Sequence, residues 1–383
     1  MPDSRKPGFT LLQMLTFLKL FNFRNYNNSE LCFEPGLNIL LGDNGQGKTN
    51  ILEAVYYLSL LRSFRTNRAS HLKQWQKDGF YIGARCCQKD GEELLLSIAY
   101  GAERKLSLNS VPIHKTSEFI GRFVCSSFIP EDMEIVKGAA LLRRRFLDIA
   151  LSQQHPVYLQ ALQLYTLALK NRNIMLRDPQ KYPRNTVTAY DYSLVENALI
   201  VEKFRQDFIE KLNLALLEQS ELFFGKQLKL SLKYASGITT NVKLPAIMEE
   251  DSLAAVYHEV LRRNYERDCR DGATRYGPHR SEMNCLFSGN LLSAYGSEGQ
   301  CRIAALALRF ACMKIMQLEL KNQDLTLIVD DVIGELDNYH RGVFLQQLQD
   351  FPQIILACTQ IPKEIKQTSR VFQVKGGNVA VLE

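Results

Sequence analysis

Short apolar runs and helical repeats alternate along the 383-residue chain. The run GLNILLG, which ends at Gly42, predicts a buried strand because it is brief, apolar and bounded by glycine. After it, Ile51, Val55 and Leu58 recur at helical spacing, and no Pro or Gly follows until well past Leu61. The pattern therefore predicts a strand, a glycine-rich turn and a helix in direct succession.

The middle of the chain has a different repeat. From about residue 128 the pattern predicts helices, and apolar residues share a face in two of them: Tyr158, Leu162, Tyr165 and Leu169, then Phe204, Phe208, Leu212 and Leu216. The segment RDPQKYPRN separates these helices with Pro179 and Pro183. At about 1.5 Å per residue, helices this short and broken do not form a long coiled-coil arm. Alternating leucines then predict a strand at Leu228, Leu230 and Leu232.

Two further elements are predicted near the C-terminal end. The segment DLTLIVDD predicts a strand over 325–329 that ends at Asp330 and Asp331. Before it, Ser297 is placed to cap a helix, and Gln300 three positions later completes a capping box. The apolar residues of that helix are Ile303, Leu306, Leu308, Phe310 and Met313. Because its start is small and polar, its positive N-terminal end can face a phosphate.

The glycine-rich turn after the first strand fits the phosphate-loop pattern G-x-x-x-x-G-K-[ST]. Its residues are Gly42, Asp43, Asn44, Gly45, Gln46, Gly47, Lys48 and Thr49. Glycine permits the backbone angles that aim consecutive N–H groups at phosphate oxygens. In this motif Lys48 reaches the β- and γ-phosphates, and the Thr49 hydroxyl holds Mg²⁺. Since a strand is predicted before the turn and a helix after it, the sequence predicts a nucleotide site.

The acidic pair supplies the remaining chemistry. Asp330 is placed to support Mg²⁺, directly or through water, and Asp331 to orient and activate the attacking water. The alternative is an acidic loop at the end of a strand, without a catalytic role.

The segment Ser297-Glu298-Gly299-Gln300 resembles the signature motif of ABC-type ATPases. In that class the signature serine completes a nucleotide site across a head-to-tail dimer. The resemblance therefore implies that Ser297, Gly299 and Gln300 contact ATP held by a second copy, and that hydrolysis releases the two copies. The order of phosphate loop, signature, acidic pair and a D-loop-like GELD segment is the order of the class.

The resemblance covers further sequence blocks and points to one protein family. The blocks LKLFNFRNY, GDNGQGKTNILEAVYYLSLLRSFRT, FIPEDMEIVKG, RRRFLD, YGPHRSEM, GSEGQCR and VDDVIGELD are similar to those of the RecF family, and they run from Leu18 to Asp337. The resemblance implies a cytoplasmic ATPase that dimerises on ATP, binds DNA and has ATP and Mg²⁺ as cofactors. It also implies that the protein works with RecO and RecR to help load RecA where single-stranded DNA meets duplex. Hydrolysis in the family is stimulated by DNA and acts as a timer.

The chain departs from the family pattern at a few positions. Cys301 replaces a glutamine after the signature, Glu282 and its neighbour replace two aspartates, and Gly334 replaces a serine in the D-loop. Asp331 stands where transporter ATPases carry glutamate, and Thr359 is the candidate for their switch histidine. Because aspartate is one methylene shorter than glutamate, we expect slow turnover, well below about 10 per second.

The motif order constrains the fold class. Because the phosphate loop lies near one end and the acidic pair near the other, we predict an α/β fold. It consists of an ABC-type ATPase head built from both chain ends and an inserted, mainly helical second domain. The predicted parts are an N-terminal extension, residues 1–13, then 14–127 of the ATPase domain, the insertion at 128–235, and 236–383 of the ATPase domain.

Composition adds modest constraints. The net charge of +6 and pI near 8.7 favour an acidic partner such as nucleic acid. Nine cysteines without C-x-x-C spacing argue against zinc and a disulfide framework, and fit a reducing cytosol. No stretch has the roughly 18 apolar residues that span a bilayer, so we expect no membrane association.

Basic residues cluster in two places that are candidates for DNA contact: Arg62, Arg65, Arg68 and Lys73, and the run Arg143, Arg144 and Arg145. Each cluster is otherwise an ordinary solvated face. Without a helix-turn-helix or zinc finger, we expect recognition of backbone and junction shape rather than of base sequence. His279 is expected to be structural, and the single Trp75 to pack in the core or on the surface rather than to stack on DNA.

Three other functions are alternatives to that of a DNA-binding, RecF-like ATPase. The protein could be an ATP-gated DNA scaffold or clamp in which hydrolysis is incidental. The ATPase subunit of a membrane transporter is disfavoured by the aspartate pair and by the density of RecF-like blocks. A small-molecule kinase is disfavoured because it needs no signature serine.

Overall fold

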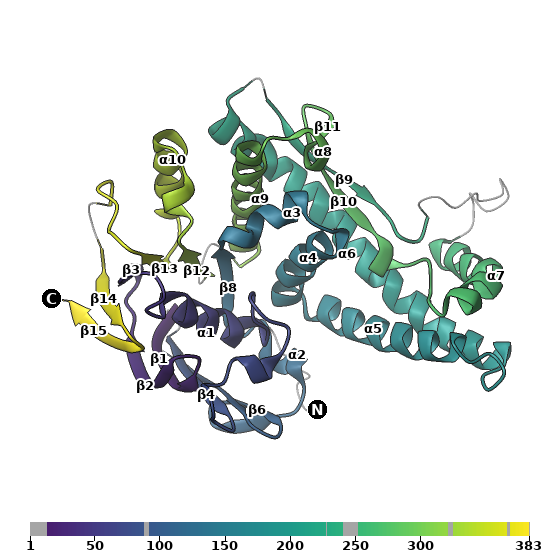
Figure 1. Cartoon of the computed structure of the whole chain (residues 1–383). Helices are drawn as coiled ribbons and strands as arrows, with labels where there is room; N and C mark the ends of the chain where they lie inside the picture. Colours follow the sequence, from purple (N-terminus) through teal and green to yellow (C-terminus); the bar gives the residue numbers. More distant parts are fainter. Residues whose placement is uncertain are drawn as a thin grey trace, which may run out of the picture. The chain divides into compact units, whose positions relative to one another are not determined.

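The computed structural model describes residues 14–87, 92–226, 228–239, 252–320, 325–365 and 368–382. The predicted extension, residues 1–13, lies outside the described residues. The chain divides into two compact units, one formed by residues up to Pro130 together with Met313 onward, the other by Glu131–Cys312. Both chain ends thus contribute to the first unit, as the predicted fold class required. In Figure 1 its early strands are purple and its last two are yellow.

A mostly parallel sheet carries the nucleotide motifs of the first unit. Its strand order is β15-β14-β3-β13-β12-β8, and only β15 runs antiparallel to its neighbour. The strands are β3 (Gly36–Leu41), β8 (Val124–Phe128), β12 (Leu325–Asp330), β13 (Gln353–Cys358), β14 (Arg370–Lys375) and β15 (Asn378–Leu382). Every residue of β12 and β13 is buried, which is typical of central parallel strands. The strands predicted before Gly42 and before the acidic pair are both confirmed.

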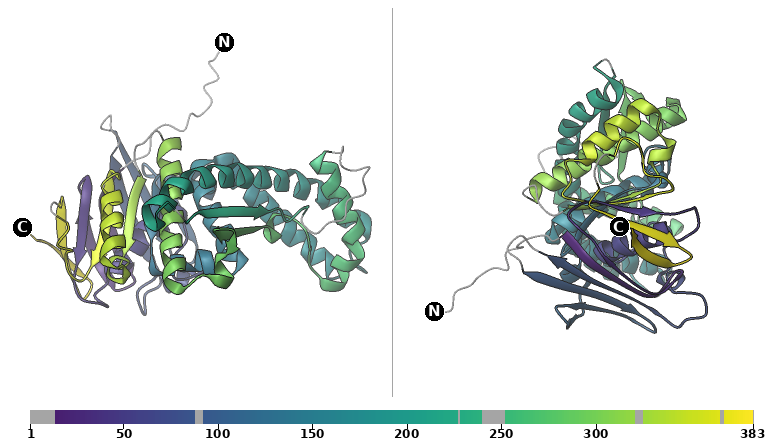
Figure 2. Two further views of the ribbon diagram at one scale, coloured as in Figure 1. Left: turned by 90° about the horizontal axis from the view of Figure 1, so that it is seen from above. Right: turned by 90° about the vertical axis from the view of Figure 1, so that its left-hand side faces the viewer.

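A second sheet in this unit is antiparallel, with the order β2-β1-β4-β5-β6-β7. Its strands are β1 (Met14–Phe23), β2 (Tyr26–Cys32), β4 (Phe80–Cys87), β5 (Glu93–Tyr100), β6 (Arg104–Leu108) and β7 (Val111–Ile113). Helix α1 (Lys48–Leu60) contacts strands of both sheets, and 11 of its 13 residues are buried. Burial on every side explains why α1 is apolar around most of its circumference. The unit also contains α2 (Thr116–Phe119) and α10 (Asn338–Leu348), and Figure 2 shows its strands from two further directions.

The second unit is mainly helical. Its helices are α3 (Glu134–Lys137), α4 (Ala140–Gln154), α5 (Pro156–Leu176), α6 (Arg184–Phe224), α7 (Leu253–Asp271) and α8 (Leu292–Tyr295). A three-stranded antiparallel sheet joins β9 (Leu230–Ala235), β10 (Glu282–Phe287) and β11 (Asn290–Leu291). Helix α9 (Glu298–Glu319) begins in this unit.

The prediction of only short, broken helices is wrong for α6. This helix has 41 residues and is therefore about 61 Å long. The break at Pro179 and Pro183 is confirmed, but after it no further proline interrupts the helix until its end. Helix α6 packs along α5 and against β9, so it belongs to a compact unit and forms no free arm.

The division into units also differs from the predicted boundaries at 127/128 and 235/236. Residues 236–312 pack with the helical unit, because β10 pairs with β9 from Glu282 opposite Ala235 to Phe287 opposite Leu230. In addition, Tyr257 and Val260 of α7 pack into a core with residues of α5 and α6. The sequence pattern predicts strands and helices in 236–312, but it does not indicate which earlier element each of them packs against. The boundary between the two units could therefore not be predicted from it.

Within the described ranges, no helix has both the length and the apolar character needed to cross a membrane.

Candidate nucleotide-binding site

The phosphate loop connects the end of β3 to the start of α1. Gly45 and Gly47 have φ angles of 77° and 117°, which residues other than glycine rarely adopt. A Cβ on Gly42 would lie 2.3 Å from the Val374 carbonyl oxygen, and one on Gly47 would lie 2.6 Å from Asn25 Nδ2. The glycines of the motif are thus required by backbone angle and by close packing.

Lys48 and Thr49 occupy the first turn of α1. The Lys48 side chain curls over the loop, where Nζ donates to the Gly42 and Asp43 carbonyl oxygens at 2.6 and 2.9 Å. Thr49 Oγ1 donates to Asp330 Oδ1 at 3.0 Å across 281 residues of sequence. The contact forms because β12 and β3 flank β13 in the sheet and end at the same edge. A hydroxyl beside a carboxylate offers the hard oxygen ligands that suit Mg²⁺.

Asp331 follows β12 and differs sharply from its neighbour. Asp330 is buried, whereas Asp331 is exposed and has a φ angle of 49°. A non-glycine residue in this left-handed region carries a strain of about 1–2 kcal/mol. The strained backbone directs Asp331 into the same cavity as Lys48, and strain of this kind is common at functional sites.

One cavity collects these groups. It has a volume of about 290 Å³ and is lined by Asn44, Gly45, Gly47, Lys48, Thr49, Asn50, Arg65, Asp330 and Asp331. Thr359 directly follows β13, whose Cys358 pairs with Leu41 at the end of β3, so this candidate switch residue lies beside the start of the loop. The predicted phosphate, magnesium and water-activating residues therefore come together, and their roles remain predictions.

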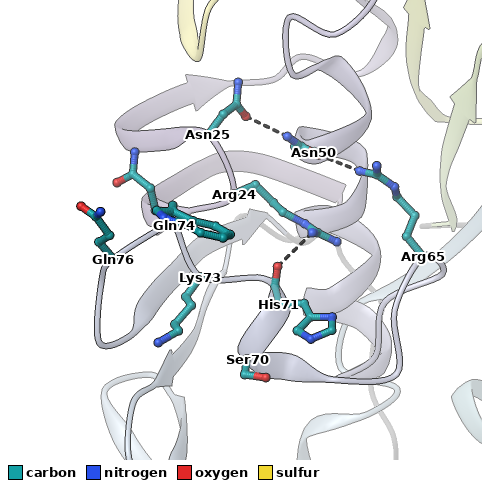
Figure 3. Close-up of a pocket in the computed structure, with 10 residues that line it drawn as sticks. Arg24, Asn25, Asn50, Arg65, Ser70, His71, Lys73, Gln74 and Gln76 are labelled. Atoms are coloured by element: carbon teal, nitrogen blue, oxygen red, sulfur yellow. Dashed lines mark hydrogen bonds between the residues drawn. The ribbon is translucent and has the colours of Figure 1, made fainter.

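Sequence reasoning missed three residues close to the loop, of which Asn25 and Asn50 buttress it. Asn25 Nδ2 donates to the Gln46 carbonyl oxygen at 3.0 Å, and Asn50 Nδ2 donates to Asn25 Oδ1 at 2.8 Å. Arg65 Nη1 donates to Asn50 Oδ1 at 2.9 Å, which completes a polar chain from the loop to the segment after α1 (Figure 3). Arg24, next to Asn25, is the third missed residue, and it bonds to Glu53 of α1 rather than to the loop. Arg24 and Asn25 lie in the block NFRNY and Asn50 directly follows Thr49, but nothing in their spacing predicts that they meet.

Arg24 is held by a buried carboxylate. Glu53 of α1 has no exposed surface and accepts hydrogen bonds from Arg24 Nε and Nη2, each at 2.7 Å. Ser63 also donates to Glu53, and its hydroxyl oxygen accepts from the backbone N–H of Arg65 at 2.9 Å. Glu53 thereby fixes the turn between β1 and β2 and the segment after α1 at the same point.

A second, larger cavity adjoins the first and shares Asn50 and Arg65 with it. Its volume is about 910 Å³, and its lining is Arg24, Asn25, Asn50, Arg65, Ser70, His71, Lys73, Gln74, Trp75 and Gln76 (Figure 3). Trp75 is 87% exposed, so of the two expected places, core or surface, the structure excludes the core. The indole instead forms part of a polar, cationic wall.

The first basic cluster is divided by the structure. Arg65 and Lys73 line the large cavity, Arg62 lines a smaller one beside Tyr57, and Arg68 is exposed. These positions are compatible with contact to an anion, and that function remains a prediction.

The second basic cluster is largely structural, which corrects the view of it as a solvated face. Arg143 is buried, and its Nε and Nη2 donate to Glu282 at 2.6 and 3.0 Å. The hydrogen bonds to Glu282 raise the pKa of Arg143. Arg144 donates to the Ser281 carbonyl oxygen at 2.9 Å, and Arg145 is half-buried. The pairing with Arg143 also accounts for the glutamate at position 282.

The signature segment forms the predicted capping box at the start of α9. The backbone N–H of Ser297 donates to Gln300 Oε1 at 2.9 Å, and that of Gln300 donates to Ser297 Oγ at 3.2 Å. Residues 297–300 are all exposed, including Gly299. Cys301 is fully buried, so this departure from the family pattern leaves the exposed face unchanged. Gly334 has open space around its Cα, so no steric requirement calls for glycine there.

His279 is structural, as expected. Its Nε2 lies 2.9 Å from the Thr274 carbonyl oxygen and its Nδ1 lies 2.5 Å from the Tyr165 hydroxyl. Burial lowers the pKa of His279 to about 4, so the imidazole is neutral at physiological pH.

Comparison with known proteins agrees with this architecture. The family model described as "RecF/RecN/SMC N terminal domain" matches residues 14–379. A DNA replication and repair protein RecF from Clostridium botulinum is 34% identical over 367 residues, which cover 94% of this chain and 98% of that protein. The chain belongs to the RecF family. A RecF from Streptococcus gordonii is 33% identical over 372 residues, covering 95% of this chain and 99% of its own.

Solved RecF structures have the same fold. "Structure of the recombination mediator protein RecF-ATP in RecFOR pathway" superposes with a TM-score of 0.87 at 28% identity, covering 99% of this chain and 100% of that one. The corresponding RecF-ATPrS structure gives a TM-score of 0.86 at 27% identity, with 98% and 100% covered. An SMC head bound to the C-terminal winged helix of ScpA, at 13% identity and a TM-score of 0.54, shares the fold alone. The fold is thus the α/β head of RecF and SMC proteins, and as a RecF-family member the chain is a protein of DNA replication and repair.

Proposed function

We propose that this RecF-family protein is a DNA-binding ATPase of recombinational repair and replication. The observation that carries the proposal is the single cavity in which Lys48, the Thr49–Asp330 pair and Asp331 meet. Lys48 would neutralise the β- and γ-phosphates, Thr49 and Asp330 would hold Mg²⁺, and Asp331 would orient the attacking water. Solved relatives named as RecF-ATP and RecF-ATPrS support ATP as the nucleotide.

The larger cavity suits the rest of the nucleotide. It adjoins the phosphate-loop cavity through Asn50 and Arg65, and its lining combines amide side chains with the indole of Trp75. Amides can hydrogen-bond a base edge or a ribose, and an indole can stack on a base. In this proposal the ATP phosphates lie on the loop and the nucleoside lies in the larger cavity.

Two copies would join around ATP in a head-to-tail dimer. The capped start of α9 is exposed and carries Ser297, Gly299 and Gln300, the groups that would meet the γ-phosphate held by the other copy. The dimer would form on gapped DNA, and slow, DNA-stimulated hydrolysis would act as the timer for release. In this way the protein would assist RecO and RecR in loading RecA at junctions between single-stranded and duplex DNA.

A scaffold in which hydrolysis is incidental is the second candidate function. Asp331→Asn separates the two, because it removes the proposed base but keeps the side-chain shape and tolerates the left-handed backbone. Loss of a general base slows hydrolysis by about 10²–10⁴-fold. A timer should then remain on gapped DNA after ATP is chased, whereas a scaffold should be released as the wild type is.

The matched control is Asp350→Asn, which makes the same change at an exposed aspartate of the first unit, outside both cavities. It should leave hydrolysis and DNA release unchanged. Hydrolysis by Asp331→Asn at the wild-type rate would contradict the catalytic assignment.

A further inference from the structure

Helix α7 in the second unit presents a row of arginines. Its buried face holds Val256, Tyr257, Val260, Leu261 and Tyr265. Toward its C-terminal end the helix also carries four exposed arginines, Arg262, Arg263, Arg267 and Arg270. Since Arg263, Arg267 and Arg270 follow at intervals of four and three residues, they share one side of the helix and span about 10 Å.

More cations surround this row. We call the arginine face the set of eight side chains formed by Arg177, Lys181, Arg184, Arg262, Arg263, Arg267, Arg270 and Arg275, all of which are exposed or half-buried. The same segments, 177–184 and 259–275, carry four carboxylates at the surface: Asp178, Glu259, Glu266 and Asp271. The surface therefore has an excess of four positive charges.

The carboxylates leave part of the row unneutralised. Glu259 accepts from Arg262 at 2.6 Å and from Arg263 at 2.5 Å, and Asp271 pairs with Arg275. Among the described residues, Arg267 and Arg270 form no ion pair within 4 Å of a carboxylate, although both cations help to lower the pKa of Asp271. These two arginines are therefore available to a ligand.

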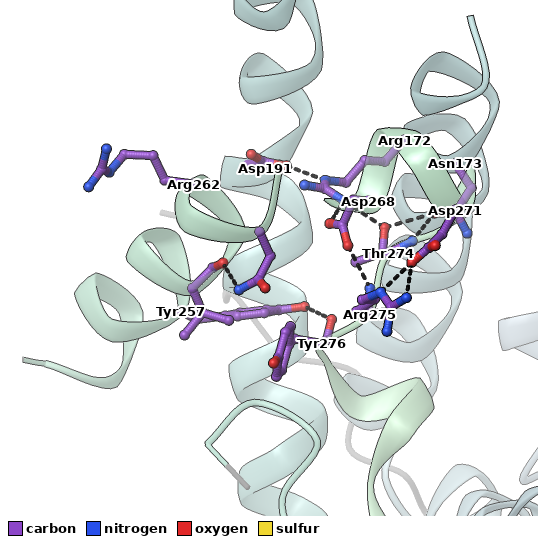
Figure 4. A network of polar contacts seen from close by, with 12 residues as sticks. Arg172, Asn173, Asp191, Tyr257, Arg262, Asp268, Asp271, Thr274, Arg275 and Tyr276 are labelled. Atoms are coloured by element: carbon purple, nitrogen blue, oxygen red, sulfur yellow. Dashed lines mark hydrogen bonds and ion pairs between the residues drawn. The ribbon is translucent and has the colours of Figure 1, made fainter. Parts of the chain in front are cut away.

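A buried network holds α7 in place (Figure 4). Arg172 of α5 has no exposed surface and donates to Asp191 of α6 and to Asp268 of α7, each at 2.8 Å. It also donates to the Thr274 hydroxyl at 2.8 Å, which fixes the segment after α7. Because one guanidinium ties three helices together, a ligand of the arginine face would not have to order the backbone that presents it.

The chemistry of the surface indicates its ligand. Between Arg262 and Arg270 every exposed residue of α7 is charged, so the face lacks the aromatic and apolar anchors of a protein interface. One strand of B-form DNA carries a phosphate about every 3.4 Å of helix axis, so a row of about 10 Å faces about three phosphates. Arginine forks also match phosphate oxygens in geometry.

We propose that the arginine face binds the phosphate backbone of DNA, separately from any contact made by the basic segment 62–73 of the first unit. The inference rests on the proposed DNA-binding function and assigns part of it to the helical unit. Because the row offers only cations to the ligand, it contributes affinity without base specificity.

The test is the salt dependence of duplex DNA binding with Mg-ATP, measured for wild type and for Arg267→Gln/Arg270→Gln. Each lost phosphate contact lowers the slope of log K against log salt by about 0.9, so the double variant should be shallower by about 2. The matched control is Lys203→Gln/Lys226→Gln, which removes two lysines of the same unit that are 78% and 86% exposed. It changes net charge equally and should keep the wild-type slope.

A second variant, Arg267→Lys/Arg270→Lys, retains the charges and should restore most of the slope. Unchanged thermal unfolding and DNA-free ATP hydrolysis would show that the glutamine variant is folded. A wild-type slope in the glutamine variant, or an equal loss in the lysine control, would overturn the inference and leave the face to an acidic protein or to solvent. Failure of the wild type itself to bind DNA would instead overturn the proposed function, and the inference with it.

Discussion

The Arg24–Glu53 pair gives the sharpest energetic prediction. Glu53 is completely buried and Arg24 is 20% exposed, and two hydrogen bonds of 2.7 Å join them. Glu53→Gln keeps the shape but removes the charge, so it leaves Arg24 without its counter-ion and weakens the bond from Ser63. Breaking a buried pair from one side costs about 3–5 kcal/mol. Because Arg24 retains some contact with water, we expect Glu53→Gln to lower the free energy of unfolding by about 3 kcal/mol, at the lower end of that range.

The assay is calorimetric unfolding, in which the transition of the first unit is identified by its upward shift with Mg-ATP. For a unit of about 200 residues, 1 kcal/mol corresponds to roughly 2–4 °C, so Glu53→Gln should lower that transition by about 6–12 °C. Arg24→Gln/Glu53→Gln should cost less than the sum of the two single changes, by about 1.5 kcal/mol or more.

The matched control is Glu30→Gln, which removes a carboxylate of the same unit. Glu30 pairs with Lys19 at 2.8 Å, but the two side chains are 52% and 41% exposed. A surface pair of this kind is worth about 0–1 kcal/mol. An effect of Glu53→Gln no larger than that of Glu30→Gln, or strict additivity in the double variant, would refute the reasoning.

Three further predictions concern single residues. Trp75 is the only tryptophan and lines the proposed nucleoside cavity. Mg-ATP should therefore change its fluorescence, whereas tripolyphosphate, which lacks the nucleoside, should not. Equal spectra with and without ATP would show that Trp75 does not contact the nucleotide. Arg143→Gln should lower the unfolding free energy of the second unit by about 2–4 kcal/mol, because Glu282 loses its partner. The salt dependence of DNA binding should stay unchanged. A weaker salt dependence would identify Arg143 as a DNA contact after all. Burial lowers the pKa of His279 from about 6.5 to about 4, so the unfolded chain binds a proton first as pH falls. Above pH 6.5 protonation of His279 does not affect stability, but between pH 6.5 and 4 it lowers the unfolding free energy of the second unit by up to about 1.4 kcal/mol per pH unit. The unfolding free energy of His279→Gln should therefore fall less over that range.

Much of the nucleotide site could be predicted from sequence because its geometry is local. The strand before Gly42, the glycine turn and the helix after it are set by neighbouring residues, and so is the capping box of Ser297 and Gln300. The motifs assigned Thr49 and Asp330 to the same Mg²⁺, and the structure brings the two side chains together because β3 and β12 end at one edge of the sheet.

Other features depend on packing between distant segments. Asn25 reaches the loop and Arg24 reaches Glu53 of α1 because the turn between β1 and β2 lies beside them, and no periodicity in the sequence predicts that placement. Arg143 looked solvated in a basic run, but its partner Glu282 lies 139 residues away. The arginine face combines the segment between α5 and α6 with α7, and Arg177 and Arg184 of that segment donate to the backbone carbonyls of Gly272 and Arg262.

The central claim is that ATP joins two copies through Ser297. Its most direct test is the molar mass in solution, with and without Mg-ATP, for wild type, Ser297→Arg and Ser297→Ala. All three proteins should bind ATP through Lys48, because the phosphate loop lies in the first unit and Ser297 in the second. With Mg-ATP the wild type should double in mass, whereas Ser297→Arg should stay monomeric. Ser297→Ala loses the helix cap without added bulk and controls for that loss, which costs about 1 kcal/mol. Equal dimerisation of wild type and Ser297→Arg, or a wild type that stays monomeric at saturating Mg-ATP, would contradict the account.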